Sequence, residues 1–184
     1  MISFRTDRAF TIIELLIVMS IIIVLAGLIL ATSGYVQKKG ARSRAEAEIA
    51  AMSAALESYK ADNGIYPREA GTTDTLDTRT SSNFSSYQSS SLYLYNSLAG
   101  ASGGSRTTAG GAKSYFAFKP NMLSPGDQTL NVTFIRDPFG NSYGYSTMKA
   151  ADPAAVGGYN PTFDLWSVAD GSPGGDQSKW IKNW

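Results

Sequence analysis

Hydrophobic and polar positions divide the chain into an apolar N-terminal run and a mixed, more polar remainder. After the polar stretch of residues 1–9, residues 12–31 are apolar with few interruptions. A run of about 20 apolar residues suffices to cross a hydrocarbon core of roughly 30 Å as a helix. The pattern therefore predicts a transmembrane helix over residues 10–31.

Beyond that run, the pattern changes to the period of an amphipathic helix. Residues 41–62 contain neither Pro nor Gly. Apolar side chains recur there at spacings of three and four, at Ala45, Ile49, Met52, Leu56 and Tyr59. Asn63-Gly64 is typical of a helix end. We therefore predict one helix over residues 10–63, on the order of 80 Å long, whose second half packs its apolar stripe on a sheet.

The remaining residues, 64–184, are predicted to form a small globular head. Residues 68–91 are rich in Thr, Ser and Asp and predict an exposed loop, and residues 92–98 predict a short helix. Short β-type segments lie at 115–118, 130–135, 143–147 and 163–168. Between the second and third of them, residues 137–141 (DPFGN) predict a tight turn. An antiparallel sheet packed on the long helix follows, which is an α+β fold.

Composition narrows the chemistry that this chain can perform. The formal net charge is +1, which argues against nucleic acid as a partner. The chain has no Cys and no His, so it has no disulfide, thiolate nucleophile, imidazole base or usual zinc ligand. A bound metal ion would need oxygen ligands.

A single carboxylate, Glu14, stands inside the apolar run. An unpaired carboxylate in an apolar environment is costly, so it should find a positive partner. A cut between Ala9 and Phe10 would create an amine about one helical turn from Glu14. The amine of a neighbouring copy would neutralise the carboxylate and also fix the register between two subunits.

Residues 8–18 (RAFTIIELLIV) resemble the prepilin cleavage and methylation motif of type IV pilins and type II secretion pseudopilins. The resemblance implies that residues 1–9 are a leader, which a prepilin peptidase removes between Ala9 and Phe10. It also implies N-methylation of Phe10 and an assembly role for Glu14. The family strongly prefers Gly at the position of Ala9. A plain signal anchor explains the apolar run alone but not this joint pattern.

Three later segments look like successive landmarks of the major pseudopilin of type II secretion. They are residues 63–67 (NGIYP), 137–145 (DPFGNSYGY) and 163–171 (FDLWSVADG). In that family a C-terminal loop binds calcium, and the resemblance places its ligands at Val168 (carbonyl), Asp170 and Asp176. The alternative is a solvated turn that closes against apolar residues within 180–184.

The resemblance implies a structural subunit of a type II secretion pseudopilus rather than an enzyme. Expected partners are further copies of the chain, minor pseudopilins, the prepilin peptidase and an inner-membrane assembly platform. The expected location is the inner membrane, crossed once, with the head in the periplasm. The alternative is a major or minor pilin of a type IV pilus for adhesion, motility or DNA uptake. The missing disulfide favours secretion.

The sequence leaves two other functions open, those of a hydrolase and of a binding module. A membrane-tethered hydrolase would use acids from the set Asp137, Asp164, Asp170 and Asp176, and a binding module would use aromatic side chains such as Tyr93 and Tyr95.

Four cations follow the apolar run, Lys38, Lys39, Arg42 and Arg44, and outnumber Arg5 and Arg8 before it. The positive-inside count therefore opposes a periplasmic head, and the predicted orientation rests on the motif.

Overall fold

The computed structural model describes residues 10–184, apart from the side chains of residues 30–33. The predicted leader, residues 1–9, and with it Ala9, lies outside the described residues. The chain divides into two compact units between Gly40 and Ala41. The head unit thus begins before residue 64, because the amphipathic half of the long helix belongs to its core.

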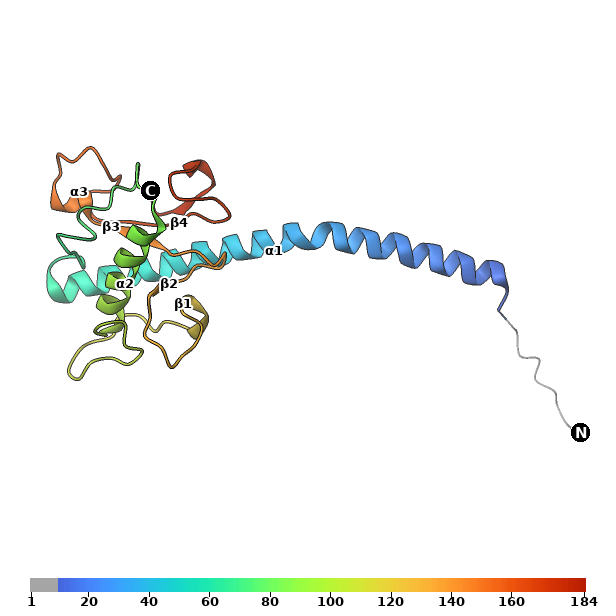
Figure 1. Cartoon of the computed structure of the whole chain (residues 1–184), viewed down its shortest axis with the longest axis horizontal. Helices are drawn as coiled ribbons and strands as arrows, with labels where there is room; N and C mark the ends of the chain where they lie inside the picture. Colours follow the sequence, from blue (N-terminus) through green and yellow to red (C-terminus); the bar gives the residue numbers. More distant parts are fainter. Residues whose placement is uncertain (1–9) are drawn as a thin grey trace, which may run out of the picture. The chain divides into compact units, whose positions relative to one another are not determined.

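Helix α1, Ile12–Asn63, confirms the predicted long helix and its end (Figure 1). Gly64 follows with φ +79° and donates its N–H to the Lys60 carbonyl at 2.8 Å. The Asn63 side-chain amide donates to the Tyr59 carbonyl at 2.8 Å. Glycine tolerates this left-handed conformation, so Asn63-Gly64 ends the helix for the reason that the sequence suggested.

Within the head, α1 buries the predicted apolar stripe. Ala45, Ile49, Met52 and Leu56 are at most 5% exposed, and Tyr59 packs against the same core. Their partners are apolar side chains of the head, among them Leu94, Leu98, Ile135 and Tyr145. The second half of α1 therefore contributes its whole apolar stripe to the larger core.

Helix α2, Phe84–Ala99, corrects the prediction of an exposed loop over 68–91 and a helix over 92–98. Asn83 caps its start by accepting the Ser85 N–H at 2.9 Å, and Gly100 ends it with φ 64°. The buried positions include Ser90 and Ser91 as well as Tyr87, Leu94 and Leu98. Small polar side chains on the inner face concealed the helical period.

The loop before α2 is also less exposed than its composition suggested. Thr73 and Thr78 are 0% exposed, and Leu76 is 4% exposed. The Thr147 N–H donates to the Thr73 carbonyl at 2.9 Å. The Thr78 hydroxyl donates to Asp164 Oδ2 at 2.9 Å. Backbone and hydroxyl hydrogen bonds to other segments therefore allow this polar stretch to be buried.

Two small antiparallel sheets complete the head. Strand β1, Leu123–Ser124, pairs with β2, Phe134–Ile135. The second sheet has the order β3-β4-β5, formed by Gly144–Ser146, Asp164–Ser167 and Ile181–Lys182. Short helices occupy Pro120–Met122 (η1), Met148–Ala151 (α3) and Gln177–Lys179 (η2). The α+β fold class is confirmed.

The strand predictions were right for β3 and β4 and partly wrong elsewhere. Residues 115–118 form no strand, and only the last two residues of 130–135 do. Phe116 and Phe118 pack by their rings, with centroids 4.6 Å apart, in a segment without strand structure. The predicted turn is confirmed, since Gly140 donates its N–H to the Asp137 carbonyl at 3.0 Å and has φ 95°.

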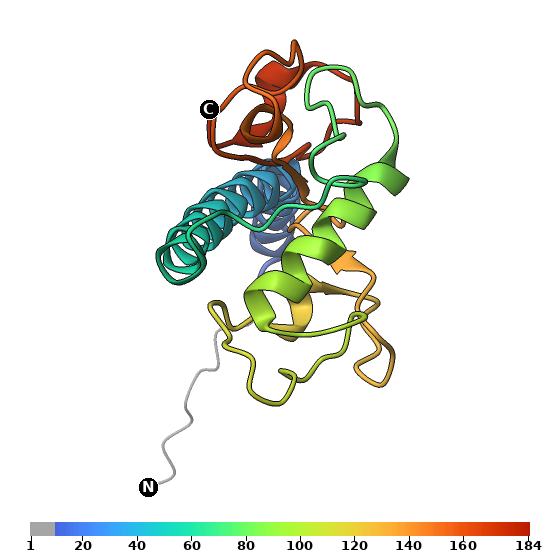
Figure 2. The same ribbon diagram turned by 90° about the vertical axis from the view of Figure 1, so that its left-hand side faces the viewer.

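The head contains a second, smaller aromatic core. It consists of Leu76, Tyr87, Trp166, Val168 and Trp180, with Trp184 packed against it. Helix α2 contributes to both cores, since Tyr87 belongs to the smaller core and Leu94 and Leu98 to the larger one. Figure 2 shows α2 extending from the C-terminal segment, drawn in red, toward the β1–β2 region, drawn in yellow.

Candidate functional site

The first site is the exposed start of α1. Glu14 lies in the first turn of the helix, and its N–H donates to the Thr11 hydroxyl at 3.3 Å. Thr11 is thus an N-cap residue, which the sequence interpretation missed although Thr before an apolar run is a recognisable cap signal. Phe10 precedes it and is 77% exposed. Phe10 and Glu14 therefore both lie at one exposed helix end.

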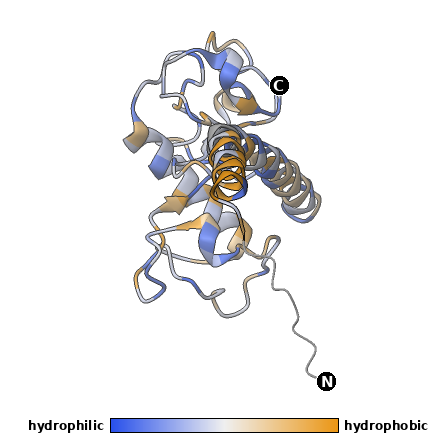
Figure 3. Ribbon diagram, turned by 90° about the vertical axis from the view of Figure 1, so that its right-hand side faces the viewer, coloured by the Kyte–Doolittle hydropathy of each residue, from blue (hydrophilic) through white to orange (hydrophobic). Residues whose placement is uncertain are grey.

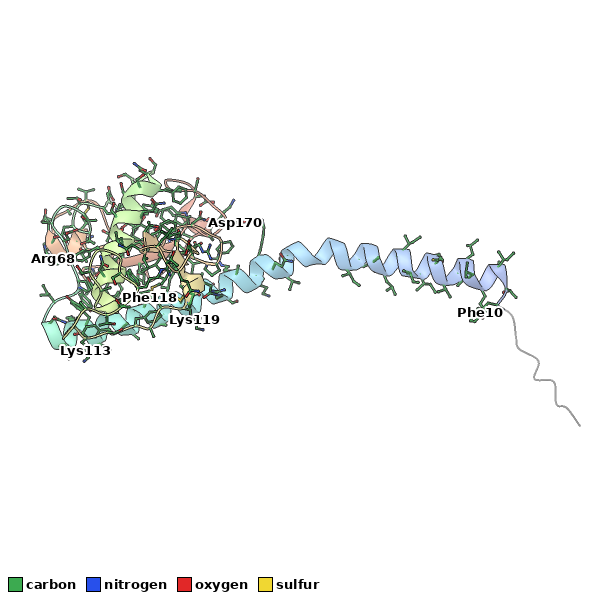
Figure 4. The ribbon with its side chains drawn as sticks, turned by 60° about the horizontal axis from the view of Figure 1, so that its bottom comes forward. Phe10, Arg68, Lys113, Phe118, Lys119 and Asp170 are labelled. Atoms are coloured by element: carbon green, nitrogen blue, oxygen red, sulfur yellow. The ribbon has the colours of Figure 1, made fainter. Side chains whose placement is uncertain are left out.

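The apolar side chains of residues 12–29 are exposed on all faces of α1. The exposed fractions of the large ones run from 48% at Val18 to 86% at Ile12. Figure 3 shows this hydrophobic half of α1, and Figure 4 shows its side chains projecting outward, beginning at Phe10. A helix of this length and composition can cross a membrane. An apolar helix surface of this kind requires lipid or other helices around it.

The C-terminal loop, residues 168–180, contains the second candidate site. The Val168 carbonyl accepts the Gly171 N–H at 2.9 Å. Asp170 lies exposed at the surface of the head (Figure 4). Asp176 is also exposed, and its Oδ1 accepts the Ser178 N–H at 3.0 Å. Hydrogen bonding from the Ser178 side chain, and then from this N–H, lowers the pKa of Asp176.

The donor set of this loop does not fit calcium well. Calcium takes about six to eight oxygen ligands, and the predicted set supplies two carboxylates and one carbonyl. Among residues 10–184, no three or more acidic, His or Cys side chains gather into a potential metal cluster. Two of the three predicted ligands also accept backbone N–H groups of the loop itself. The calcium site stays a prediction.

Asp137 and Asp164, the other acids considered for catalysis, serve the backbone around them. Asp137 accepts the N–H groups of Phe139 and Asn141 and the Ser167 hydroxyl. Burial raises the pKa of the Asp137 carboxyl, although these donors oppose the rise. Asp164 accepts the Thr78 hydroxyl and two N–H groups of the 159–160 segment. Both carboxylates therefore stabilise turns.

The aromatic residues considered for ligand binding also make contacts within the head. Tyr95 is 3% exposed and donates its hydroxyl to the Ser105 carbonyl at 2.7 Å. Tyr93 donates to the Arg68 carbonyl at 2.7 Å. Both hydroxyls join α2 to neighbouring loops.

Comparison with protein-family models gives two matches. Residues 4–30 match the prokaryotic N-terminal methylation motif, and residues 34–99 match protein G of the type II secretion system. The second match ends at Ala99, the last residue of α2. No match was found among curated proteins or among solved structures.

The two matches agree with the architecture described above. The methylation-motif match includes the first turn of α1 and its exposed apolar surface, and the protein G match includes the amphipathic half of α1 and the whole of α2. The match to protein G favours secretion over a type IV pilus. The chain belongs to the type IV pilin-like superfamily and is a pseudopilin, a structural subunit of type II secretion.

Proposed function

We propose that this pseudopilin forms its filament by exchanging lipid for neighbouring helices along residues 12–29 of α1. The supporting observation is the exposure of every large apolar side chain in that segment, at 48% or more. Ser20, a polar residue within it, donates its hydroxyl to the Ile17 carbonyl of the same helix at 2.8 Å. Such a surface can pack either in a bilayer or against copies of itself.

Within this proposal, Glu14 sets the register between subunits. The prepilin peptidase cuts between Ala9 and Phe10, and the Phe10 amine of one copy neutralises Glu14 of its neighbour. The exposed position of Glu14 in the first turn of α1 supports this pairing. Desolvating a lone carboxylate costs several kcal/mol, so a mispaired register is unfavourable.

The head lies in the periplasm in this proposal, although the count of flanking cations opposes that orientation. Two of the four cations after the apolar run are engaged within the head. Arg42 donates to the carbonyls of Lys179 and Trp180, and Arg44 pairs with Glu48 at 2.8 Å. These contacts give both arginines a structural role in the head, and the proposed orientation rests on the match to the methylation motif.

The partners follow from the same mechanism. An inner-membrane assembly platform extracts subunits from the bilayer and adds them at the filament base, and minor pseudopilins complete the filament. Filaments purified from a host with the secretion genes should contain this chain and appear helical by electron microscopy. Secretion that continues unchanged after deletion of the gene would contradict the proposed function.

The orientation has its own test, because the chain contains no Cys. A Gly126→Cys variant places one thiol on an exposed loop of the head. A membrane-impermeant maleimide should label it in spheroplasts with intact inner membranes. Labelling that requires a permeabilised inner membrane would place the head in the cytoplasm instead.

A further inference from the structure

The side-chain amide of Gln177 links the C-terminal loop to two distant segments of the head. Its Nε2 donates to the Thr78 carbonyl at 2.9 Å and to the Arg79 carbonyl at 3.4 Å. Its Oε1 accepts the Tyr159 hydroxyl at 2.7 Å. The donors of the amide face carbonyls and its acceptor faces a hydroxyl, so one side chain joins the loop to two distant segments.

An aromatic stack lies beside this amide. The rings of Tyr159 and Trp184 are parallel within 9°, with centroids 4.7 Å apart. The Arg79 guanidinium lies 4.5 Å from the Tyr159 ring centroid, and the Lys182 ammonium lies 5.0 Å from that of Trp184. Cations over aromatic faces are attracted to the ring electrons. The stack therefore fixes the chain end against the same segments that Gln177 joins.

The base of the loop is also fastened by protein groups. Arg42 donates to the Lys179 carbonyl at 2.8 Å and to the Trp180 carbonyl at 3.3 Å. The Trp180 ring is 2% exposed and lies parallel to that of Trp166, with centroids 6.2 Å apart. Two points of the loop, Gln177 and residues 179–180, are thus held by groups of the protein itself.

We propose that Gln177 and the Tyr159–Trp184 stack replace calcium in this chain, so that the head folds and stays folded without the ion. After Gly174-Gly175 the loop has one carboxylate, Asp176, and the three residues that follow it, Gln177, Ser178 and Lys179, carry none. The Lys179 ammonium adds a positive charge to the loop, which disfavours a cation there. The small number of carboxylates and the hydrogen bonds of Gln177 both favour a loop that is stable without calcium.

The first test compares the melting of the full-length protein in detergent micelles with calcium and with EGTA. All three tryptophans lie in the head, at positions 166, 180 and 184, so intrinsic fluorescence reports its unfolding. We expect the same Tm in EGTA and in about 10 mM calcium, a concentration above the millimolar Kd of weak extracellular calcium modules. At ten to a hundred times its Kd, a bound ion would raise Tm by roughly 5–10 °C, and such a shift would overturn the proposal.

The second test removes the amide. Gln177→Ala should lower Tm by roughly 5 °C, by the same amount in calcium and in EGTA, because it leaves the Thr78 carbonyl and the Tyr159 hydroxyl unpaired. Gln128→Ala, at an exposed amide of another loop, is the control and should keep the parental Tm. An unchanged Tm for Gln177→Ala would refute the role of the amide. Should that variant fail to fold, the parental comparison in calcium and EGTA still decides the proposal.

Discussion

Tyr143 donates its hydroxyl to Glu48 Oε2 at 2.8 Å and so joins the loop before β3 to helix α1. The other carboxylate oxygen of Glu48 accepts the Arg44 guanidinium N–H at 2.8 Å. Tyr143 is fully buried, and burial together with the Glu48 carboxylate raises its pKa well above the ordinary value. This link joins two parts of the head unit, the loop before β3 and the amphipathic half of α1.

Tyr143→Phe should destabilise the head by about 1–2 kcal/mol. The substitution keeps the ring but removes a hydrogen bond to a charged acceptor. Urea unfolding followed by tryptophan fluorescence measures the change. Tyr35→Phe, at a residue 71% exposed and outside the head unit, should leave the free energy of unfolding unchanged. Equal stabilities for the two variants would contradict the role of the Tyr143 hydrogen bond.

The raised pKa of Tyr87 predicts that the head loses stability at alkaline pH. Burial raises the pKa of Tyr87 from 10.0 to about 12. The unfolded chain releases this proton near pH 10 while the folded head retains it, so stability falls as pH rises from about 10 to about 12. This single group contributes about 2–3 kcal/mol to that fall.

Tyr87→Phe should therefore flatten the dependence of the unfolding free energy on pH in this range. Circular dichroism in urea, from about pH 9 to about pH 12, measures both slopes. The comparison is between parental and variant slopes, because other tyrosines also titrate. Identical slopes would show that folding does not raise the pKa of Tyr87.

Gly144 allows β3 to approach the indole of Trp166. A Cβ at Gly144 would lie 2.2 Å from Trp166 Cε2 and Cζ2. Gly144→Ala should therefore cost about 1–3 kcal/mol or more, with a fluorescence change that reports displacement of Trp166. Gly126→Ala is the matched control, since nothing lies within 4 Å of its added Cβ. Parental stability for Gly144→Ala would contradict the close approach.

The features that the sequence predicted well are those that depend on neighbouring residues. The stripe from Ala45 to Tyr59, the helix end at Asn63 and the turn at Asp137 each follow from spacing or local backbone preference. The apolar surface of residues 12–29 could be predicted simply by counting apolar side chains. These signals lie within one element, so no knowledge of the packing was needed.

The features that the sequence did not predict depend on distant partners. Ser91 is buried in α2 because its hydroxyl accepts the Ile135 N–H at 2.9 Å, from a residue 44 positions away. Gln177 bonds to Thr78, 99 positions away. Strand β5 is two residues long, and only its pairing with β4 makes it a strand. Contacts between residues so far apart cannot be predicted from local composition or spacing.

Processing of the N-terminus can be read directly by mass spectrometry. The mature protein from its host should begin at Phe10 and carry the mass of one additional methyl group. The same gene expressed without a prepilin peptidase should yield a chain that retains residues 1–9. A host protein that still begins at Met1 would contradict cleavage between Ala9 and Phe10.

The most direct test of the assembly mechanism is the polymer yield of Glu14→Gln. This variant keeps the size of the side chain but removes the charge, which leaves the neighbouring Phe10 amine unpaired in an apolar interface. Glu46→Gln, an exposed carboxylate that pairs with Arg42 on the head, is the control. At equal subunit levels, sheared and sedimented filaments should fall by more than about tenfold for Glu14→Gln and stay at the parental yield for Glu46→Gln. A parental yield from Glu14→Gln would contradict the pairing of Glu14 with the amine of a neighbouring subunit.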